Sequence, residues 1–198
     1  MLALAPGFAD GVQSSQRVFR QVMNAFARPG TVCPLTESVE APAPLSRGAA
    51  MIALTLCDHD TRVWLDPALA AAPAVAEWLR FHTGAPIAAR PADAALAFVA
   101  DVDPLPDLMQ FAQGTAEYPD RSTTLVVQVR DLANGPKVRL TGPGVKGHAT
   151  LCAAGRGDDF VVRMQRNRAQ FPCGVDLLFV TEHAVAALPR SIQVEAEG

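Results

Sequence analysis

The pattern of apolar and polar residues predicts that helices and strands alternate along most of the chain. We predict helices over residues 10–27, 46–57, 73–83, 105–113 and 158–169. Short apolar runs predict strands at residues 63–65, 96–100, 123–130, 137–141, 175–180, 184–188 and 191–195. Pro34 confines the extended piece at residues 31–35 to an edge or a loop. This alternation indicates an α/β sandwich, and without a repeat or linker it forms one domain over residues 1–198.

The first predicted helix is amphipathic. Its apolar residues fall on one stripe, formed by Phe8, Val12, Phe19, Met23 and Phe26. The opposite side is polar, with Gln13, Arg17, Arg20 and Asn24. Pro29 ends this helix because the residue before a proline avoids helical backbone angles.

The next two helices carry clear end signals. Ser46 is expected to cap the second helix, and the run at 49–57 has no charged residue, so this helix should be buried nearly all round. Pro73 suits the first turn of the third helix, and Gly84 stops it.

Two features concern the strands. Asn134-Gly135 lies between the strands at 123–130 and 137–141, which predicts an antiparallel hairpin. Asp176 falls inside an apolar strand, where a lone carboxylate is costly, so it needs a partner. Arg190 is the candidate partner, in a structural role.

Composition and charge exclude several classes of function. The chain has 17 Lys and Arg residues against 20 Asp and Glu residues, a formal net charge of −3. Nucleic-acid binding is therefore disfavoured. No apolar run approaches the roughly 20 residues of a membrane-spanning helix. The cysteines lack the close pairs typical of metal sites, so we interpret them as reduced thiols of a cytoplasmic protein: Cys33, Cys57, Cys152 and Cys173.

A glycine-rich segment carries an ambiguous motif. The segment from Gly142 to Gly147 has the letter pattern of a dinucleotide-binding turn. It follows a predicted hairpin strand instead of opening a parallel βαβ unit, which favours a simple turn. A stand-alone nucleotide-dependent oxidoreductase using this turn is the alternative function.

Histidines and acids occur together at two helix ends. Asp58-His59-Asp60 could bind a metal or relay protons, but adjacent residues seldom point at one centre, so turn and capping roles are favoured. We interpret His82 as a hydrogen-bonded histidine partly in the core. The alternative is an anion site at this helix end, formed by Arg80, His82 and Thr83. No serine-hydrolase elbow, zinc-protease helix, Walker loop or cysteine-nucleophile signature occurs.

Several segments, in order, resemble one protein family across nearly the whole chain. These are residues 19–20 with 27–30, 53–61 with 63–65, 81–83 with 85–86, 114–115, 124–125 with 128–129, 140–144, 171–172 with 174–177, and 188–190 with 194–195. The residues include Ala-Arg-Pro-Gly30, Leu-Cys-Asp-His-Asp60 and Leu-Thr-Gly-Pro-Gly144. Together they resemble PhnH, the H-subunit family of carbon–phosphorus lyase.

The resemblance implies a function in phosphonate metabolism. It implies a cytoplasmic homodimer in a core complex with the G, I and J subunits of carbon–phosphorus lyase. That complex transfers a ribose triphosphate unit from ATP to an alkylphosphonate and releases adenine, and a separate radical step breaks the C–P bond. This chain lacks the cysteine spacing of an iron–sulfur cluster, so the radical step is expected on the J subunit. We expect an assembly or ligand-binding subunit with no active centre of its own.

The resemblance also implies a fold. The family is similar to the large domain of pyridoxal-phosphate-dependent transferases without the cofactor, so we expect a three-layer αβα sandwich with a mixed sheet and no cofactor. A Schiff base needs a lysine amine, and the chain has only Lys137 and Lys146.

The family-like segments supply a candidate site, without any metal. It consists of six polar residues in turns and at helix ends: Arg28, Asp58, Asp60, His82, Thr83 and Arg190. If these turns converge, they form a polar patch for a subunit interface or for a phosphonate or nucleotide-phosphate ligand.

Overall fold

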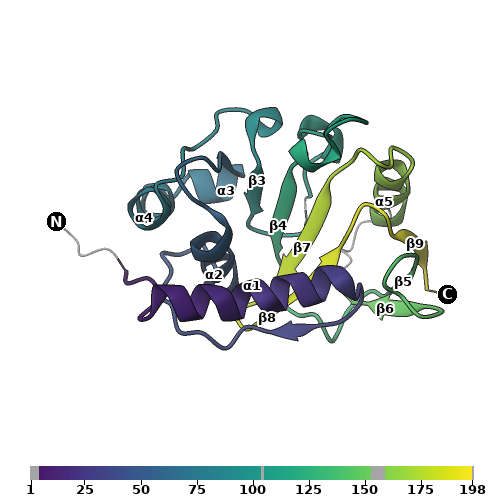
Figure 1. The fold of residues 1–198 in the computed structure, drawn as a ribbon, viewed down its shortest axis with the longest axis horizontal. Helices are drawn as coiled ribbons and strands as arrows, with labels where there is room; N and C mark the ends of the chain where they lie inside the picture. Colours follow the sequence, from purple (N-terminus) through teal and green to yellow (C-terminus); the bar gives the residue numbers. More distant parts are fainter. Residues whose placement is uncertain (1–4, 104, 153–158, 198) are drawn as a thin grey trace.

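The computed structural model describes residues 5–103, 105–152 and 159–197, which form a central sheet covered on both faces (Figure 1). The sheet has six strands in the order β1-β8-β7-β4-β3-β2. Four neighbours run parallel: β7 (Asp176–Val180), β4 (Thr124–Gln128), β3 (Leu96–Val99) and β2 (Val63–Leu65). β8 (Ala184–Leu188) is antiparallel to β7, and β1 (Cys33–Pro34) is antiparallel to β8 at the edge. The predicted α/β class and mixed sheet are therefore confirmed.

Different elements cover the two faces of this sheet. Four helices cover the first face: α1 (Gly11–Ala27), α2 (Arg47–Leu56), α3 (Pro67–Ala70) and α4 (Pro73–Thr83). α5 (Phe160–Arg168) and the short 3-10 helix η2 (Leu108–Gln110) lie over the second face, together with an antiparallel sheet in the order β6-β5-β9. The strands of that sheet are β5 (Val138–Thr141), β6 (Ala149–Leu151) and β9 (Gln193–Ala196). Two further 3-10 turns are η1 (Pro91–Asp93) and η3 (Pro119–Arg121).

Each face of the sheet supports its own apolar core. In β7, Leu178 and Val180 pack with the helices of the first face, while Leu177 and Phe179 pack with the layer on the second face. Because successive side chains of a strand point to opposite faces, a strand buried on both sides must be apolar throughout. This requirement explains the unbroken apolar runs in β4 and β7.

The predicted helix ends are confirmed where the signal is local. The Ser46 hydroxyl accepts a hydrogen bond from the Ala49 N–H at 3.2 Å and caps α2, whose residues 48–53 are buried. Pro73 occupies the first turn of α4, and Gly84 ends that helix with a φ of 72°. α5 matches the helix predicted at 158–169, of which residue 158 lies outside the described residues.

The predicted hairpin of residues 123–130 and 137–141 is wrong. β4 pairs in parallel with β3 and β7 in the central sheet, whereas β5 pairs with β6 and β9 in the small sheet. The apolar residues of β4 require burial on both faces, while β5 alternates between buried Val138 and exposed Arg139. The two strands therefore belong in different layers.

The helix predicted at residues 105–113 is also wrong, because only η2 forms there. Asp107 caps η2 by accepting a hydrogen bond from the Met109 N–H at 3.2 Å. The Gln113 amide donates to the carbonyl oxygens of Leu108 at 2.7 Å and Phe111 at 2.8 Å. These side-chain bonds satisfy backbone groups that a continued helix would otherwise pair.

The apolar stripe of α1 does not form the buried face of that helix. Its buried residues are Ser14, Val18, Val22 and Ala25. Phe8 and Phe26 are partly buried, but Val12, Phe19 and Met23 remain 72%, 47% and 49% exposed. α1 runs across the surface of the molecule in Figure 1, so these three side chains, called the outer stripe below, face away from the core.

Candidate functional site

A cavity of about 540 Å³ opens at the carboxyl ends of β4 and β7, and we call it the carboxyl-edge cavity. It lies between the segment that follows β4 and the turn that joins β7 to β8. Its lining consists of Val32, Arg130, Asp131, Leu132, Ala133, Thr181, Glu182, His183 and Ala184. Open α/β sheets bind ligands beyond the carboxyl ends of their parallel strands, so this cavity is the candidate functional site.

The β7–β8 turn is fastened to the start of α2. A carboxylate oxygen of Glu182 accepts hydrogen bonds from the backbone N–H and the Nε of Arg47, both at 3.1 Å. Nη2 of Arg47 lies 3.3 Å from Nε2 of His183. Because Arg47 is the first residue of α2, the Glu182 carboxylate lies at the positive end of the helix dipole. These contacts hold one wall of the cavity.

The segment after β4 forms the other wall. The Asp131 carboxylate accepts hydrogen bonds from the Ala133 N–H at 2.7 Å and from the Asn134 amide at 2.6 Å. These bonds hold the pKa of Asp131 below its ordinary value. The exposed Arg130 side chain makes no hydrogen bond or ion pair within the described ranges. The cavity therefore contains an uncommitted guanidinium.

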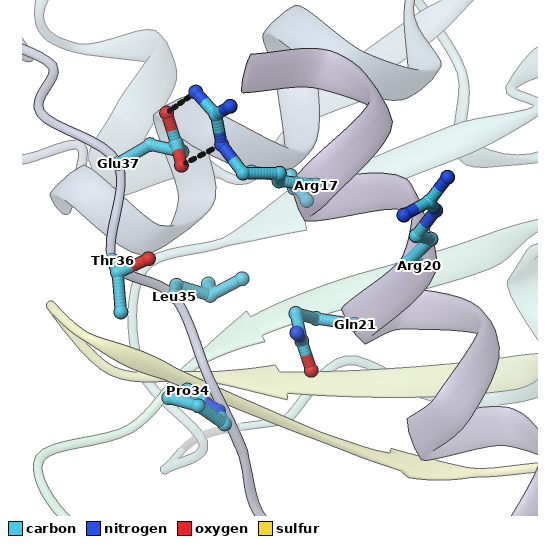
Figure 2. A pocket seen from close by; sticks show the side chains of 8 residues that line it. Arg17, Arg20, Gln21, Pro34, Leu35, Thr36 and Glu37 are labelled. Atoms are coloured by element: carbon cyan, nitrogen blue, oxygen red, sulfur yellow. Dashed lines mark hydrogen bonds and ion pairs between the residues drawn. The ribbon is translucent and has the colours of Figure 1, made fainter. Parts of the chain in front are cut away.

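A smaller groove of about 170 Å³ lies between α1 and the segment after β1. Arg17 donates from Nε to Oε1 of Glu37 at 2.7 Å and from Nη2 to Oε2 at 2.9 Å, and the Ser14 hydroxyl donates to Oε2 at 2.6 Å. These bonds, chiefly those from Arg17, lower the pKa of Glu37 to about 2. Figure 2 shows Arg17 and Glu37 facing each other, with the Arg20 guanidinium pointing away. The pair fastens α1 to the edge of the sheet.

The six residues predicted as one polar patch lie in three places. Arg28 follows α1, near the β5–β6 turn, because a Cβ on Gly144 would contact Pro29 at 3.1 Å. Asp58, Asp60, His82 and Thr83 lie together near the ends of α2 and α4, where a Cβ on Gly84 would lie 3.5 Å from Cβ of His59. Figure 1 shows α4 and the end of α1 on opposite sides of the molecule.

Arg190 occupies the third place and pairs with Asp176, as the sequence predicted. Its backbone N–H donates to Oδ1 of Asp176 at 2.8 Å, and its Nε donates to the same oxygen at 3.1 Å. The guanidinium also donates to the Pro119 carbonyl at 2.7 Å and to the Ser122 hydroxyl. These contacts join the β8–β9 turn to the amino ends of β4 and β7. These contacts fasten three parts of the chain together, which favours a structural role for the pair.

The group at the ends of α2 and α4 follows the structural interpretation made from the sequence. Asp58 accepts hydrogen bonds from the N–H groups of Asp60 and Thr61 at 3.0 and 2.9 Å, while the His59 side chain is 81% exposed. Nε2 of the half-buried His82 lies 3.0 Å from the Ala5 carbonyl oxygen. Asp58 therefore stabilises a turn, and His82 fastens the N-terminal segment to α4.

The segment from Gly142 to Gly147 connects two antiparallel strands, β5 and β6, and no helix follows it directly. Gly144 has a φ of 81°, and a Cβ there would overlap the Ala27 carbonyl. Glycine is needed for this close approach to α1. The structure thus gives no support to a dinucleotide-binding turn.

The described residues contain no group of three or more His, Cys, Asp or Glu side chains that could hold a metal ion. All four cysteines are free. Burial, with a smaller contribution from the Asp58 charge, raises the pKa of the Cys57 thiol to about 12, so this thiol is a poor nucleophile. Within the same described ranges, no helix is long and apolar enough to span a membrane.

Sequence reasoning missed the residues of the carboxyl-edge cavity. Arg130, Glu182 and His183 come directly after strands β4 and β7, and charged residues at that position are the available signal. The misassigned hairpin obscured this signal, because the prediction placed Arg130 at the end of a hairpin strand, residues 123–130. Arg47 and His183 are 136 residues apart, and no local pattern joins them.

Comparison with known proteins establishes the family. Residues 6–195 match the family described as "Bacterial phosphonate metabolism protein (PhnH)". A relative from Rhizobium meliloti (strain 1021), "Alpha-D-ribose 1-methylphosphonate 5-triphosphate synthase subunit PhnH", is 45% identical over 96% of this chain and 94% of its own. A relative from Stutzerimonas stutzeri, "Putative C-P lyase subunit protein HtxG", is 31% identical over 92% of this chain and 87% of its own. The chain therefore belongs to the PhnH family of bacterial phosphonate metabolism proteins.

Proposed function

We propose that this chain is an assembly subunit of a complex that transfers ribose triphosphate from ATP to an alkylphosphonate and releases adenine. Its partners are a second copy of itself and the G, I and J subunits of carbon–phosphorus lyase. Both relatives are named as subunits, which supports a role within a larger assembly. Four free cysteines favour the reducing cytoplasm as its location.

The outer stripe of α1 is the observation that carries this proposal. Val12, Phe19 and Met23 are large apolar side chains on one helix, and each is at least 47% exposed. Large apolar side chains exposed on one face of a helix are typical of protein interfaces. Phenylalanine and methionine are also enriched in interface cores. We assign the outer stripe to a contact with another subunit.

The charged side chains of the chain favour a structural role over a catalytic one. In the Asp176–Arg190 pair and in the Arg17–Glu37 pair, each charged group is bound by its own partner within the chain. Lys137 and Lys146 are both exposed and lie outside the carboxyl-edge cavity, so neither is placed to hold pyridoxal phosphate as a Schiff base there. The mixed sheet between two covering layers supports a relationship to the large domain of pyridoxal-phosphate-dependent transferases. That relationship is part of the proposal.

Co-expression tests the proposal. The chain is produced with tagged G, I and J subunits, in wild-type form and as the double variant Phe19→Glu/Met23→Glu. We expect the wild-type chain to co-purify and the double variant to be largely lost, because two charges would be buried in an apolar contact. Phe81→Glu is the matched control, since Phe81 is 69% exposed and belongs to a different helix, α4. Co-purification of the double variant at the wild-type level would refute the assignment.

A further inference from the structure

The carboxyl-edge cavity has the size and position of a small-molecule site. Its volume of about 540 Å³ falls within the roughly 300–1,000 Å³ of typical ligand pockets. Two walls meet there, one following β4 and one formed by the β7–β8 turn. The hydrogen bonds of Asp131 and of Glu182 hold these walls in place. The cavity is thus formed before any ligand enters it.

Arg47 contacts one of the two imidazole nitrogens of His183. Nη2 of Arg47 lies 3.3 Å from Nε2 of His183. Arg47 does not use the other ring nitrogen, Nδ1, which is therefore available to a ligand in the cavity that His183 lines.

Both carboxylates of the cavity already accept hydrogen bonds from within the chain. Glu182 is paired with Arg47 and receives the first N–H of α2, while Asp131 receives two donors from its own turn. The Arg130 guanidinium has no partner among the residues described. The free hydrogen-bonding groups of the lining therefore include two donors, the Arg130 guanidinium and the Thr181 hydroxyl, together with Nδ1 of His183. The Thr181 hydroxyl oxygen accepts a hydrogen bond from the His183 backbone N–H at 3.2 Å.

The rest of the lining is apolar. Val32, Leu132, Ala133 and Ala184 complete the walls. A ligand that fits both the donors and these apolar walls carries an anionic group joined to a less polar body. Donors from two separate loops suit a tetrahedral oxyanion, which offers three oxygens, better than a planar carboxylate, which offers two.

We propose that the carboxyl-edge cavity binds a small phosphate- or phosphonate-bearing molecule, with its oxyanion held by Arg130, His183 and Thr181. This site is separate from the outer stripe and goes beyond the assembly function proposed above. Arg130 holds the charge in bidentate fashion, while His183 and Thr181 orient the third oxygen. The apolar wall then receives the organic part of the ligand.

Calorimetry on the purified full chain tests the site. The probes are ribose 5-phosphate, methylphosphonate and ATP, with acetate as a planar carboxylate. We expect at least one of the first three to bind, and Arg130→Gln to weaken that binding by about tenfold or more, the effect of losing one strong charge-assisted contact. Arg139→Gln is the matched control, because Arg139 is an exposed arginine on β5, outside the cavity.

Three results would overturn the proposal. They are no binding of any phosphate or phosphonate probe, equal weakening by Arg130→Gln and Arg139→Gln, and acetate binding as tightly as the phosphate probes. Arg130→Gln is also tested for co-purification with the G, I and J subunits. If Arg130→Gln still co-purifies but no longer binds the probe, the ligand site is supported. Loss of assembly in Phe19→Glu/Met23→Glu would concern the outer stripe alone and would not change that result.

Discussion

Arg190 fastens the β8–β9 turn to the first residue of β7 through its backbone N–H and its guanidinium, both of which bind Asp176. The two side chains are only 13% and 18% exposed, so neither charge is well solvated without the other. Removing one partner of such a pair leaves the other uncompensated.

We therefore predict that Arg190→Met destabilises the protein by about 2–3 kcal/mol in urea unfolding. Asp176→Asn added to Arg190→Met should recover part of that loss, because the uncompensated charge is then absent. Arg90→Met serves as the control, since the Arg90 side chain is 74% exposed beside Asp93 and the change should have a much smaller effect. Equal losses in the two single variants would contradict the prediction.

The Arg17–Glu37 pair predicts a pH-dependent stability. The pKa of Glu37 falls from 4.5 to about 2 on folding, so the folded state favours the ionised carboxylate. Its contribution is complete above pH 4.5 and decreases as the pH falls toward 2. Glu37→Gln should lower the free energy of unfolding by about 1 kcal/mol at pH 7 and by progressively less below pH 4.5.

Urea unfolding of both proteins between pH 7 and pH 3 measures this difference. Glu40→Gln is the control, because the exposed Glu40 side chain makes no hydrogen bond or ion pair within the described parts of the chain. If the difference in the free energy of unfolding between the wild type and Glu37→Gln stays constant down to pH 3, Glu37 is not held in its charged form.

Gly48 allows α2 to approach the β7–β8 turn. A Cβ at this position would overlap the Thr181 carbonyl oxygen, which belongs to the backbone and cannot move alone. We expect Gly48→Ala to lower the free energy of unfolding by about 2–3 kcal/mol. Gly11→Ala, at the start of α1 with no atom within 4 Å of the new Cβ, should have little effect. Similar melting temperatures for the two variants would rule out this close approach.

The Cys57 thiol should resist alkylation. Its pKa of about 12 and its burial leave almost no accessible thiolate at neutral pH. Mass spectrometry after brief iodoacetamide treatment should find Cys173, which is half-buried, labelled before Cys57. Both should react in guanidinium chloride. Native labelling of Cys57 as fast as Cys173 would contradict the assigned burial.

Local signals in the sequence were sufficient for most helices. Ser46 and Gly84 determine helix ends through contacts within a few residues of themselves. The partner of Asp176 was also predictable, because a carboxylate in an apolar strand needs a cation and Arg190 comes just after the next strand, β8.

Contacts between segments that are far apart in the sequence were not predictable. β4 pairs with β7, some fifty residues along the chain, instead of with β5, and no feature of either strand alone determines that choice. The buried side of α1 depends on α2 and β8, which select small Ala25 and Val22 over the larger Phe19. The six predicted site residues divide among three places because their positions also depend on contacts between segments that are far apart in the sequence.

We propose that this chain acts as a subunit within a larger assembly. Native mass spectrometry of the complex purified after co-expression with the G, I and J subunits tests it most directly. We expect a species containing two copies of this 20.9 kDa chain together with those subunits, and we expect this species to be lost in the Phe19→Glu/Met23→Glu variant. A complete G, I and J assembly that excludes the chain, with the chain remaining at 20.9 kDa, would refute this subunit role.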